Sequence, residues 1–265
     1  NIVNLLELQN GEKVTTMLRL AQDQQEGYLT MVTAGGYIKR TPLNQYANIR
    51  KSGLIAINLE ENDSLAWTRI TTGENQLLVA TRNGQAIRFY ESDARSMGRT
   101  ARGVRCVRLM GDDKVVGVGL LREGATVFTV TEQGKGRRTN IEDYRMQRRG
   151  GKGIRNYAKG TVAGIKVLDD TDDIILISMD GVIIRMHAAD INVQSRYGSG
   201  VRVMRLGETD KVVTVARTEH DDTEELAKPE QEEMEELTLE EIAALEAEDA
   251  ASDNEPVEDE PEEQE

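Results

Sequence analysis

Residues 81–88 read TRNGQAIR, and the pattern Thr-x-x-Gly-x-x-x-Arg in this stretch occurs four times in the chain, once with Ser for Thr. The other copies begin at Thr33, Thr131 and Ser178, so that successive starting points lie 48, 50 and 47 residues apart. A second glycine follows the first by 17 or 19 residues, and an aliphatic residue comes after it; these glycines are Gly53, Gly103, Gly153 and Gly200. A period of roughly fifty residues is typical of propeller blades or solenoid turns that share a core.

Each unit begins with an apolar run of strand length, at residues 29–32, 77–80, 127–130 and 174–177. Pairs such as Asn83-Gly84 follow these runs, and such pairs tolerate the positive φ of a tight turn, so we expect the first two strands to form a hairpin. Two more strands are expected in the rest of each unit, for example at residues 104–109 and 115–120, with a trimmed second hairpin in the third unit. Four strands per unit predict an all-β, propeller-like chain.

The repeat divides the chain into blades and a tail. We expect a half blade at residues 1–24, because residues 2–20 match the second half of a unit, and then blades at 25–72, 73–122, 123–169 and 170–218. The sequence is therefore interpreted as a fragment that starts inside a blade. Residues 219–265 are expected to form an acidic, mostly disordered tail. Within it, Thr238 and Glu241 have capping-box spacing ahead of an apolar run, which predicts an isolated, transient helix.

The formal net charge of −14 is the sum of two parts of the chain with opposite net charge. Residues 219–265 hold 23 acidic residues and one lysine, or −22, whereas the other 218 residues hold 32 basic and 24 acidic residues, or +8. The one cysteine excludes internal disulfides and multi-thiolate metal sites. The two histidines leave few other metal ligands, so we predict no metal site and expect His187 to be packed or solvated. No apolar stretch is long enough to span a membrane, and no secretory leader is visible.

Basic residues, mostly arginines, gather between the second and third strands expected in each unit. The candidate phosphate-binding residues of this kind are Lys39, Arg40, Arg50, Lys51, Arg88, Arg95, Arg99, Arg102, Arg138, Arg185, Arg196 and Arg202. Because a repeat places equivalent positions on one rim, we expect a continuous belt of guanidinium groups. Arginines with Gly-rich turns suit phosphates, whose neutralisation releases counterions and makes the affinity salt-dependent.

The strongest local signal is the heptapeptide QRRGGKG at residues 147–153. It consists of Gln147, Arg148, Arg149, Gly150, Gly151, Lys152 and Gly153. Three cations beside three glycines, which let backbone N–H groups approach a ligand, predict a phosphate clamp. Devices that read bases are absent from the sequence: it has no recognition helix, no zinc module and only 4% aromatic residues. Binding to a nucleic-acid backbone, with bending and without sequence preference, is therefore expected.

This heptapeptide resembles the gyrase box, and the four hairpin units are similar to the blades of the C-terminal domain found in the A subunit of bacterial DNA gyrase. The resemblance covers residues 1 to about 218, and an acidic tail after the last blade is also found in that family. It implies a β-pinwheel, a propeller variant with strands exchanged between blades, which wraps duplex DNA around its perimeter. In that family the box lies in the first blade, whereas here it lies in the third full unit. Two interpretations stay open: a functional box, or a second box-like copy.

The resemblance also implies the setting in which the chain works. Its partners would be duplex DNA, the remainder of the A subunit of DNA gyrase, and the gyrase B subunit in an A2B2 holoenzyme that introduces negative supercoils, in the bacterial cytoplasm at the nucleoid. The domain with the nucleophilic tyrosine is missing from the sequence, so the chain itself is expected to be non-catalytic. It is expected to need no cofactor, because ATP and Mg²⁺ belong to other parts of the holoenzyme.

Two other interpretations remain. The homologous domain of topoisomerase IV, which would select substrates, usually has fewer blades and a degenerate or absent box; the preserved heptapeptide and the acidic tail argue against it. A propeller that serves as a protein-interaction platform would carry kelch or WD signatures, which the sequence lacks. For the tail, the charge division predicts competition with DNA for the arginine belt, which truncation after Arg217 would test; the alternative is a tail that only improves solubility.

Overall fold

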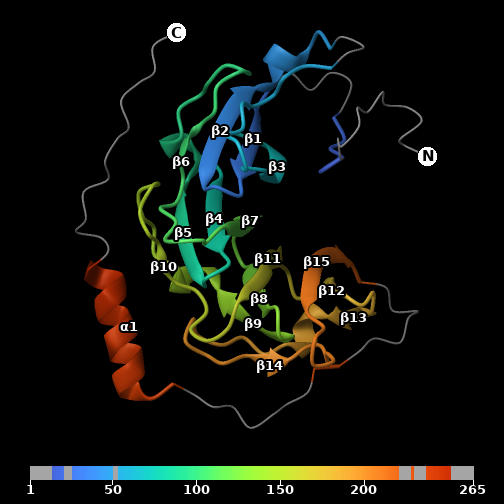
Figure 1. Cartoon of the computed structure of the whole chain (residues 1–265), viewed down its shortest axis with the longest axis vertical. Coiled ribbons are helices and arrows are strands. Elements are labelled where there is room, and N and C mark those ends of the chain that lie inside the picture. The colour runs from blue at the N-terminus through green and yellow to red at the C-terminus, as the bar shows by residue number, and fades with distance from the viewer. Residues whose placement is uncertain (1–13, 21–25, 50–52, 221–227, 230–236, 252–265) are drawn as a thin grey trace.

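The computed structural model describes residues 14–20, 26–49, 53–220, 228–229 and 237–251. Most of the half blade expected at residues 1–24 lies outside the described residues, as do Arg50 and Lys51. The described part is built from four antiparallel sheets, which follow one another along an open arc (Figure 1). The predicted all-β, propeller-like class is confirmed.

The four sheets, which we call blades 1 to 4, share one plan. Blade 1 has the strand order β3(Leu65–Thr71), β1(Tyr28–Thr33), β2(Tyr37–Pro42), β6(Val104–Arg105). Blade 2 has the order β7(Val115–Leu120), β4(Gln76–Thr81), β5(Gln85–Tyr90), β10(Ile154–Arg155). Blade 3 has the order β11(Val162–Leu168), β8(Thr126–Thr131), β9(Lys135–Asn140), β14(Val201–Arg202), and blade 4 has only β15(Val212–Glu219), β12(Asp172–Ser178), β13(Ile183–His187). The expected hairpin at the start of each unit is present as β1–β2, β4–β5, β8–β9 and β12–β13.

The hairpin turns explain the repeated threonine and glycine. Gly84 has φ 84°, a conformation that favours glycine, and its N–H donates to the carbonyl of Thr81 at 3.1 Å. The Thr81 hydroxyl accepts from the N–H of Gln85 at 3.2 Å. Hydroxyls at the start of the other three turns accept in the same way. The pattern Thr-x-x-Gly therefore encodes a turn that satisfies its own backbone groups.

The third strand of a unit belongs to the preceding blade. β6, β10 and β14 are two residues long and pair with β2, β5 and β9 of the unit before them. The strand exchange that the resemblance implied is confirmed, whereas the expectation of long third strands in the units' own second hairpins is wrong. Residues 55–59 form no strand, and the strand expected at residues 104–109 ends after two residues.

The second glycine of the repeat makes this exchange possible. A Cβ atom on Gly153 would lie 2.5 Å from the carbonyl oxygen of Ala86, and one on Gly103 would lie 2.6 Å from that of Ile38. Both glycines also have positive φ, 81° and 113°. Only glycine lets the exchanged strand approach the neighbouring blade this closely.

The core lies mainly between neighbouring blades. One cluster joins Val32 and Ile38 of blade 1 to Leu77 and Phe89 of blade 2, and two further clusters join the later blades in the same way. Adjacent blades therefore stabilise one another by burying apolar area, at about 25 cal/mol per Å².

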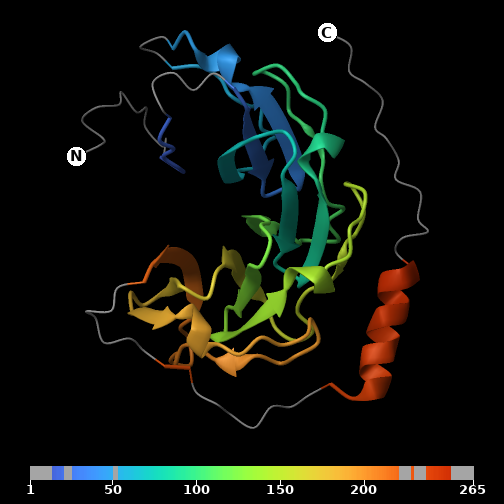
Figure 2. The same ribbon diagram turned by 180° about the vertical axis from the view of Figure 1, so that it is seen from behind.

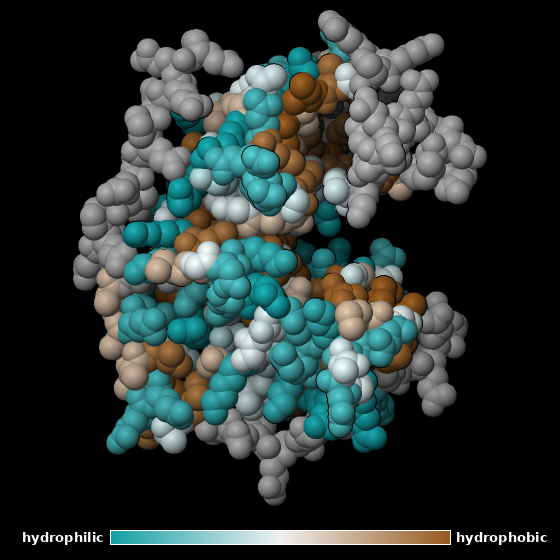
Figure 3. Space-filling view, in the orientation of Figure 1, coloured by the Kyte–Doolittle hydropathy of each residue, from teal (hydrophilic) through white to brown (hydrophobic). Residues whose placement is uncertain are grey.

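In Figure 3, hydrophilic side chains cover most of the middle of the arc, and hydrophobic side chains gather at its two ends, beside the gap.

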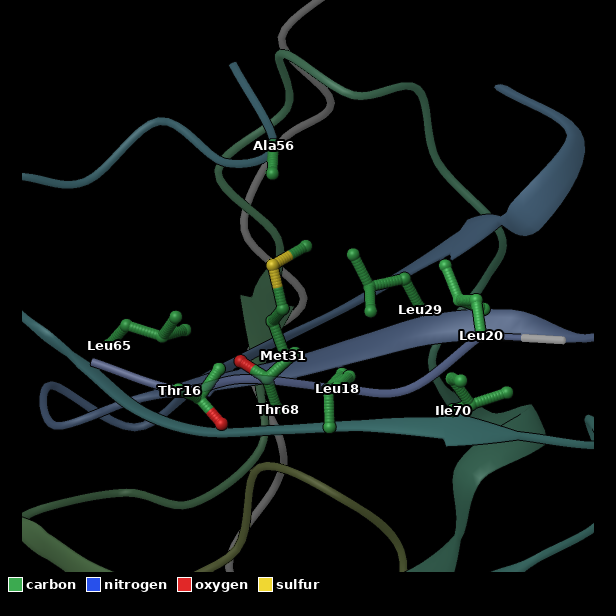
Figure 4. Close-up of a pocket in the computed structure, with 9 residues that line it drawn as sticks. All are labelled: Thr16, Leu18, Leu20, Leu29, Met31, Ala56, Leu65, Thr68 and Ile70. Atoms are coloured by element: carbon green, nitrogen blue, oxygen red, sulfur yellow. The ribbon is translucent and has the colours of Figure 1, made fainter. Parts of the chain in front are cut away.

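At the N-terminal end of the arc, residues 14–20 run beside blade 1 without forming a strand. Leu18 and Leu20 face Leu29, Met31 and other apolar side chains of blade 1 across a pocket of about 300 Å³ (Figure 4). The lining is almost wholly apolar, which is the character of a packing surface.

The helix predicted in the acidic tail is present as α1(Leu239–Ala251). Its capping box is formed as predicted: the N–H of Glu241 donates to the Thr238 hydroxyl at 3.2 Å, and the N–H of Thr238 donates to the Glu241 carboxylate at 2.8 Å. The helix lies beside the outer side of the blades near β10 (Figure 1) and contacts it, so the expectation of an isolated helix is wrong. Among the described residues, no helix is long and apolar enough to cross a membrane.

Candidate nucleic-acid interface

The arginines of the Thr-x-x-Gly-x-x-x-Arg pattern lie between blades. Arg40 and Arg138 are buried and Arg88 is half-buried. Each donates to backbone carbonyls at the 3₁₀ helix of the next unit, and these helices are η3(Glu91–Asp93), η4(Ile141–Asp143) and η5(Ala188–Asp190). The bonds run from Nε of Arg40 to Ala94 O at 2.8 Å, from an Nη of Arg88 to Ile141 O at 2.9 Å, and from Nε of Arg138 to Ile191 O at 2.8 Å. Guanidinium groups held in this way join neighbouring blades.

Lys39 and Arg137 occupy equivalent positions of the first and third units and are also buried. Lys39 Nζ donates to the carbonyls of Ala56 and Arg99. Burial, together with the nearby charge of Arg99, lowers the pKa of Lys39 to about 8. Arg137 donates to backbone carbonyls of the fourth unit, and its guanidinium stacks over the ring of Tyr157 at 4.5 Å. The sequence candidate Lys39 is therefore an interior group.

A second set of arginines, four residues before the second glycine, connects each loop to the preceding unit. Arg149 donates to the carbonyl of Asp93 at 2.8 Å and to that of Arg105 at 3.1 Å. Arg196 donates to the carbonyl of Arg155. The third member, Arg99, is half-buried and accepts the Lys39 ammonium through its own carbonyl. These hydrogen bonds hold the basic loop of each unit against the unit before it.

The heptapeptide at 147–153 forms a loop that crosses onto blade 2. The N–H of Gln147 donates to Arg88 O, and the N–H of Gly150 donates to Cys106 O, both at 2.8 Å. The carbonyl of Gly151 accepts from the N–H of Arg108 at 2.8 Å. Arg148 is exposed beyond this anchored backbone, and Lys152 is half-buried. The loop is therefore fixed, and its first arginine faces solvent.

The remaining candidates lie at several depths. Arg95 is exposed on the loop after η3. Arg102 pairs with Glu60 and lies over the ring of Tyr37, with 4.1 Å from its guanidinium carbon to the ring centroid. Arg185 pairs with Asp173 inside blade 4, Nε to Oδ2 at 2.9 Å. Arg202 is half-buried on β14.

The sequence analysis gave no separate weight to a third set of arginines, to which Arg202 belongs. The triplets Gly103-Val104-Arg105, Gly153-Ile154-Arg155 and Gly200-Val201-Arg202 repeat the pattern Gly-aliphatic-Arg. Their arginines are the second residues of the exchanged strands β6, β10 and β14, so we call them the rim arginines. The signal that could have identified these residues is the arginine that follows the repeated glycine and aliphatic residue in three of the four units.

The last turn of α1 shows which chemical groups bind at the rim arginines. One oxygen of the Asp249 carboxylate accepts from the backbone N–H of Arg155 at 2.8 Å, and the other accepts from the Arg196 guanidinium at 3.1 Å. The Asp249 carbonyl accepts from Arg145, and the Glu248 carboxylate lies 3.4 Å from an Nη of Arg155. Seen from the other side in Figure 2, α1 again lies outside the arc beside the blades.

We call this group of donors the anion notch; it consists of Arg145, Arg155 with its backbone N–H, and Arg196. A backbone N–H and converging guanidinium groups around a carboxylate are also the donors that bind a phosphate oxygen. A cleft of about 390 Å³ adjoins the notch and is lined by Arg108, Lys152 and the last turn of α1, among others. Lys152 of the heptapeptide and Arg155 of the rim thus line the same cleft.

Comparison with known proteins assigns the chain to a family. Residues 27–72, 75–122, 125–169 and 172–219 match the family model described as DNA gyrase C-terminal domain, beta-propeller. The chain belongs to this family. The DNA gyrase A subunit of Haloquadratum walsbyi is 46% identical over 158 residues, which are 57% of this chain and 18% of that protein. The DNA gyrase A subunit of Staphylococcus epidermidis is 41% identical over 157 residues, which are 58% of this chain and 18% of that protein. The chain thus spans less than a fifth of the length of these relatives.

Two solved structures have the same fold. The C-terminal domain of DNA topoisomerase IV superposes with a TM-score of 0.78 and 26% identity, covering 93% of this chain and 74% of that one. A DNA gyrase A C-terminal domain superposes with a TM-score of 0.73 and 26% identity, covering 82% of this chain and 74% of that one. Four blades, three of which receive an exchanged strand, identify the architecture as a gyrase-type β-pinwheel.

Proposed function

We propose that this gyrase C-terminal domain binds duplex DNA along the outer rim of its arc and bends it, without preference for sequence. The observation that carries the proposal is the anion notch, in which the chain's own Asp249 carboxylate occupies a site built from the Arg155 N–H and the Arg196 guanidinium. DNA phosphates would take the same donors. The rim arginines repeat from blade to blade, so one phosphate strand can meet equivalent donors at successive blades.

Charge supports this assignment. The chain before residue 219 carries +8, although the whole chain carries −14. Within the described residues no helix is placed to enter a groove and read base edges, because α1 is acidic. The protein would therefore contact the sugar-phosphate backbone of the DNA, and bending of the DNA would bring this backbone within reach of further blades.

In the whole protein we propose the role of the DNA gyrase A subunit: the wrapped DNA is presented to an A2B2 assembly that introduces negative supercoils with ATP, in the cytoplasm at the nucleoid. The higher TM-score with the topoisomerase IV domain favours a second candidate, substrate selection in that enzyme. An assay of the holoenzyme with ATP on relaxed and, separately, on supercoiled circular DNA separates the two. Net negative supercoiling supports gyrase, and relaxation alone supports topoisomerase IV.

The binding proposal is tested by measuring affinity for random-sequence duplexes at several salt concentrations. If six or more phosphates are neutralised, the association constant should fall at least about a thousandfold between about 50 and 200 mM salt. Ligation of short DNA in the presence of the protein should show that bound DNA is bent. A flat salt response, or strong preference for one sequence, contradicts the proposal.

A further inference from the structure

Both histidines of the chain meet on one buried carboxylate at an end of blade 4. Nδ1 of His187 lies 2.9 Å from Oδ1 of Asp173, and Nδ1 of His220 lies 2.7 Å from the same oxygen. The ring centroids are 4.1 Å apart, so the two imidazoles present neighbouring edges to that oxygen. Asp173 is fully buried, while the side chains of His187 and His220 are 22% and 28% exposed. The carboxylate end of the cluster is therefore buried, and its imidazole end is open to solvent.

The other blades show that the fold does not require these residues. Counting from the turn residue Ser178, the positions of Asp173 and His187 correspond to Gln76 and Tyr90 in blade 2. The corresponding residues are Tyr28 and Pro42 in blade 1 and Thr126 and Asn140 in blade 3. Each of these three pairs lies at the end of the equivalent hairpin in its own blade. A carboxylate opposite an imidazole is thus particular to blade 4 among the described blades.

The repeated arginine of blade 4, Arg185, has different partners from its equivalents in the other blades. Arg40, Arg88 and Arg138 donate to the 3₁₀ helix of the next unit, but Arg185 turns to its own blade. It donates to Oδ2 of Asp173 at 2.9 Å and to the carbonyl of Glu219 at 2.9 Å. This leaves Oδ1 for the histidines and fixes the plane of the carboxylate. A carboxylate held by a hydrogen bond on its second oxygen is the usual arrangement around a metal ligand.

The geometry points to a binding site for a divalent transition metal of the Zn²⁺ class, with Asp173, His187 and His220 as ligands. Two imidazole nitrogens and one carboxylate oxygen are a ligand set that Zn²⁺ accepts, with a further position left for water. The ligand atoms of the three residues all lie within 4.8 Å of one another. In a tetrahedral zinc site they would stand about 3.3 Å apart, so each Nδ1 has to move away from Oδ1 by about half an ångström, and the spread of up to 4.8 Å among the three ligand atoms has to shorten.

A metal here would join three strands and the origin of the tail. Asp173 is on β12, His187 is the last residue of β13, and His220 directly follows β15. Blade 4 has three strands among the described residues, whereas blades 1 to 3 each receive a fourth from the next unit. Metal ligation across β13, β12 and β15 would hold these three strands together, and it would fix the point at which the acidic tail leaves the blade.

The test uses the full chain, prepared metal-free and without a histidine tag, and titrates it with Co²⁺ in the presence of excess Mg²⁺. Mg²⁺ occupies the many carboxylates of the tail, and Co²⁺ bound to imidazole nitrogen gives visible absorption bands. We expect one equivalent of Co²⁺ to bind, Zn²⁺ to displace it, and Zn²⁺ to raise the melting temperature. His187→Gln and His220→Gln should each weaken Co²⁺ binding at least about tenfold.

The matched control is Asp190→Asn, which removes an exposed carboxylate from the same blade and should leave Co²⁺ binding unchanged. His220→Gln is the decisive variant, because this residue follows the last strand and its loss removes no strand pairing; circular dichroism verifies the fold. Absence of the Co²⁺ bands, or an unchanged titration in His220→Gln, overturns the proposal. Loss of binding in both histidine variants but not in Asp190→Asn supports it.

Discussion

Two sets of arginines recur with the same period but lie in different surroundings. The interior arginines, Arg40, Arg88 and Arg138, join blades through backbone carbonyls. The rim arginines lie on the exchanged strands, where one of them binds the carboxylates of the tail. A repeat shows that residues are equivalent, but it does not show which side of the sheet their side chains occupy. Periodic arginine alone is therefore no measure of a DNA-binding surface.

The largest effect we expect comes from breaking an interior contact. Arg138→Ala leaves the buried carbonyl of Ile191 without its donor and separates Asp170 from its cation. The free energy of unfolding should fall by about 2–4 kcal/mol, because buried polar groups lose their partners. Urea denaturation monitored by circular dichroism measures it.

Arg148→Ala is the matched control on the surface, because Arg148 is exposed and its replacement removes the same charge. The unfolding free energy of this variant should stay within about 0.5 kcal/mol of the parent chain. Equal losses in both variants would show that the interior and surface arginines do not differ in the way the structure indicates.

The next effect concerns DNA affinity. Replacing Arg148, Arg149 and Lys152 together by Ala should weaken duplex binding about 10- to 100-fold at low salt and reduce the salt dependence by up to about three counterions. DNA bending should decrease as well. Fluorescence anisotropy against salt concentration provides the measurement.

The comparison variant replaces Arg95, Arg99 and Arg102 by Ala. A larger loss in the 147–153 variant shows that the heptapeptide works as a functional box. Equal losses show that it is one basic loop among others, a second box-like copy. Because Arg149 also anchors its loop to Asp93 and Arg105, the unfolding free energy of both variants has to be measured beside the affinity.

A smaller effect is expected from the rim. Arg155→Gln removes one phosphate donor and its contact with Glu248, so affinity should fall about three- to tenfold and the salt slope by about one. Arg122→Gln is the control: Arg122 is exposed and pairs with Asp169. A loss of affinity in Arg122→Gln as large as that in Arg155→Gln would point to general charge attraction instead of a rim site.

Local patterns were sufficient to predict the hairpins, because a turn is encoded within eight residues such as 81–88. The exchange of strands depends on the approach of Gly153 to the Ala86 carbonyl, a long-range contact that the residue pattern alone could not place. The burial of Lys39 likewise depends on carbonyls that lie 17 and 60 residues away. Propensity describes neighbours along the chain, whereas burial of a cation is decided by tertiary packing.

The cluster of Asp173, His187 and His220 was missed for the same reason. Two histidines 33 residues apart form no metal-binding spacing, and only strand pairing brings them to one carboxylate. The anion notch was predicted in part. Arg196 was a candidate, but its contact with Arg155 depends on the strand exchange, and its contact with the tail helix joins residues 53 positions apart.

The smallest effect concerns the tail, whose helix α1 binds the notch through Asp249. Glu248→Gln with Asp249→Asn removes two carboxylates from the rim, so DNA should bind about two- to fivefold more tightly at low salt. The advantage should shrink as salt screens the remaining charge of the tail. Neutralising Asp253 and Glu255 makes the same change in net charge outside the described helix, and it should have less effect if docking matters. Truncation after His220 should tighten binding further and keeps the three residues of the blade 4 cluster. Unchanged affinity in both the truncated chain and the double variant at low salt would leave the tail with a role in solubility alone.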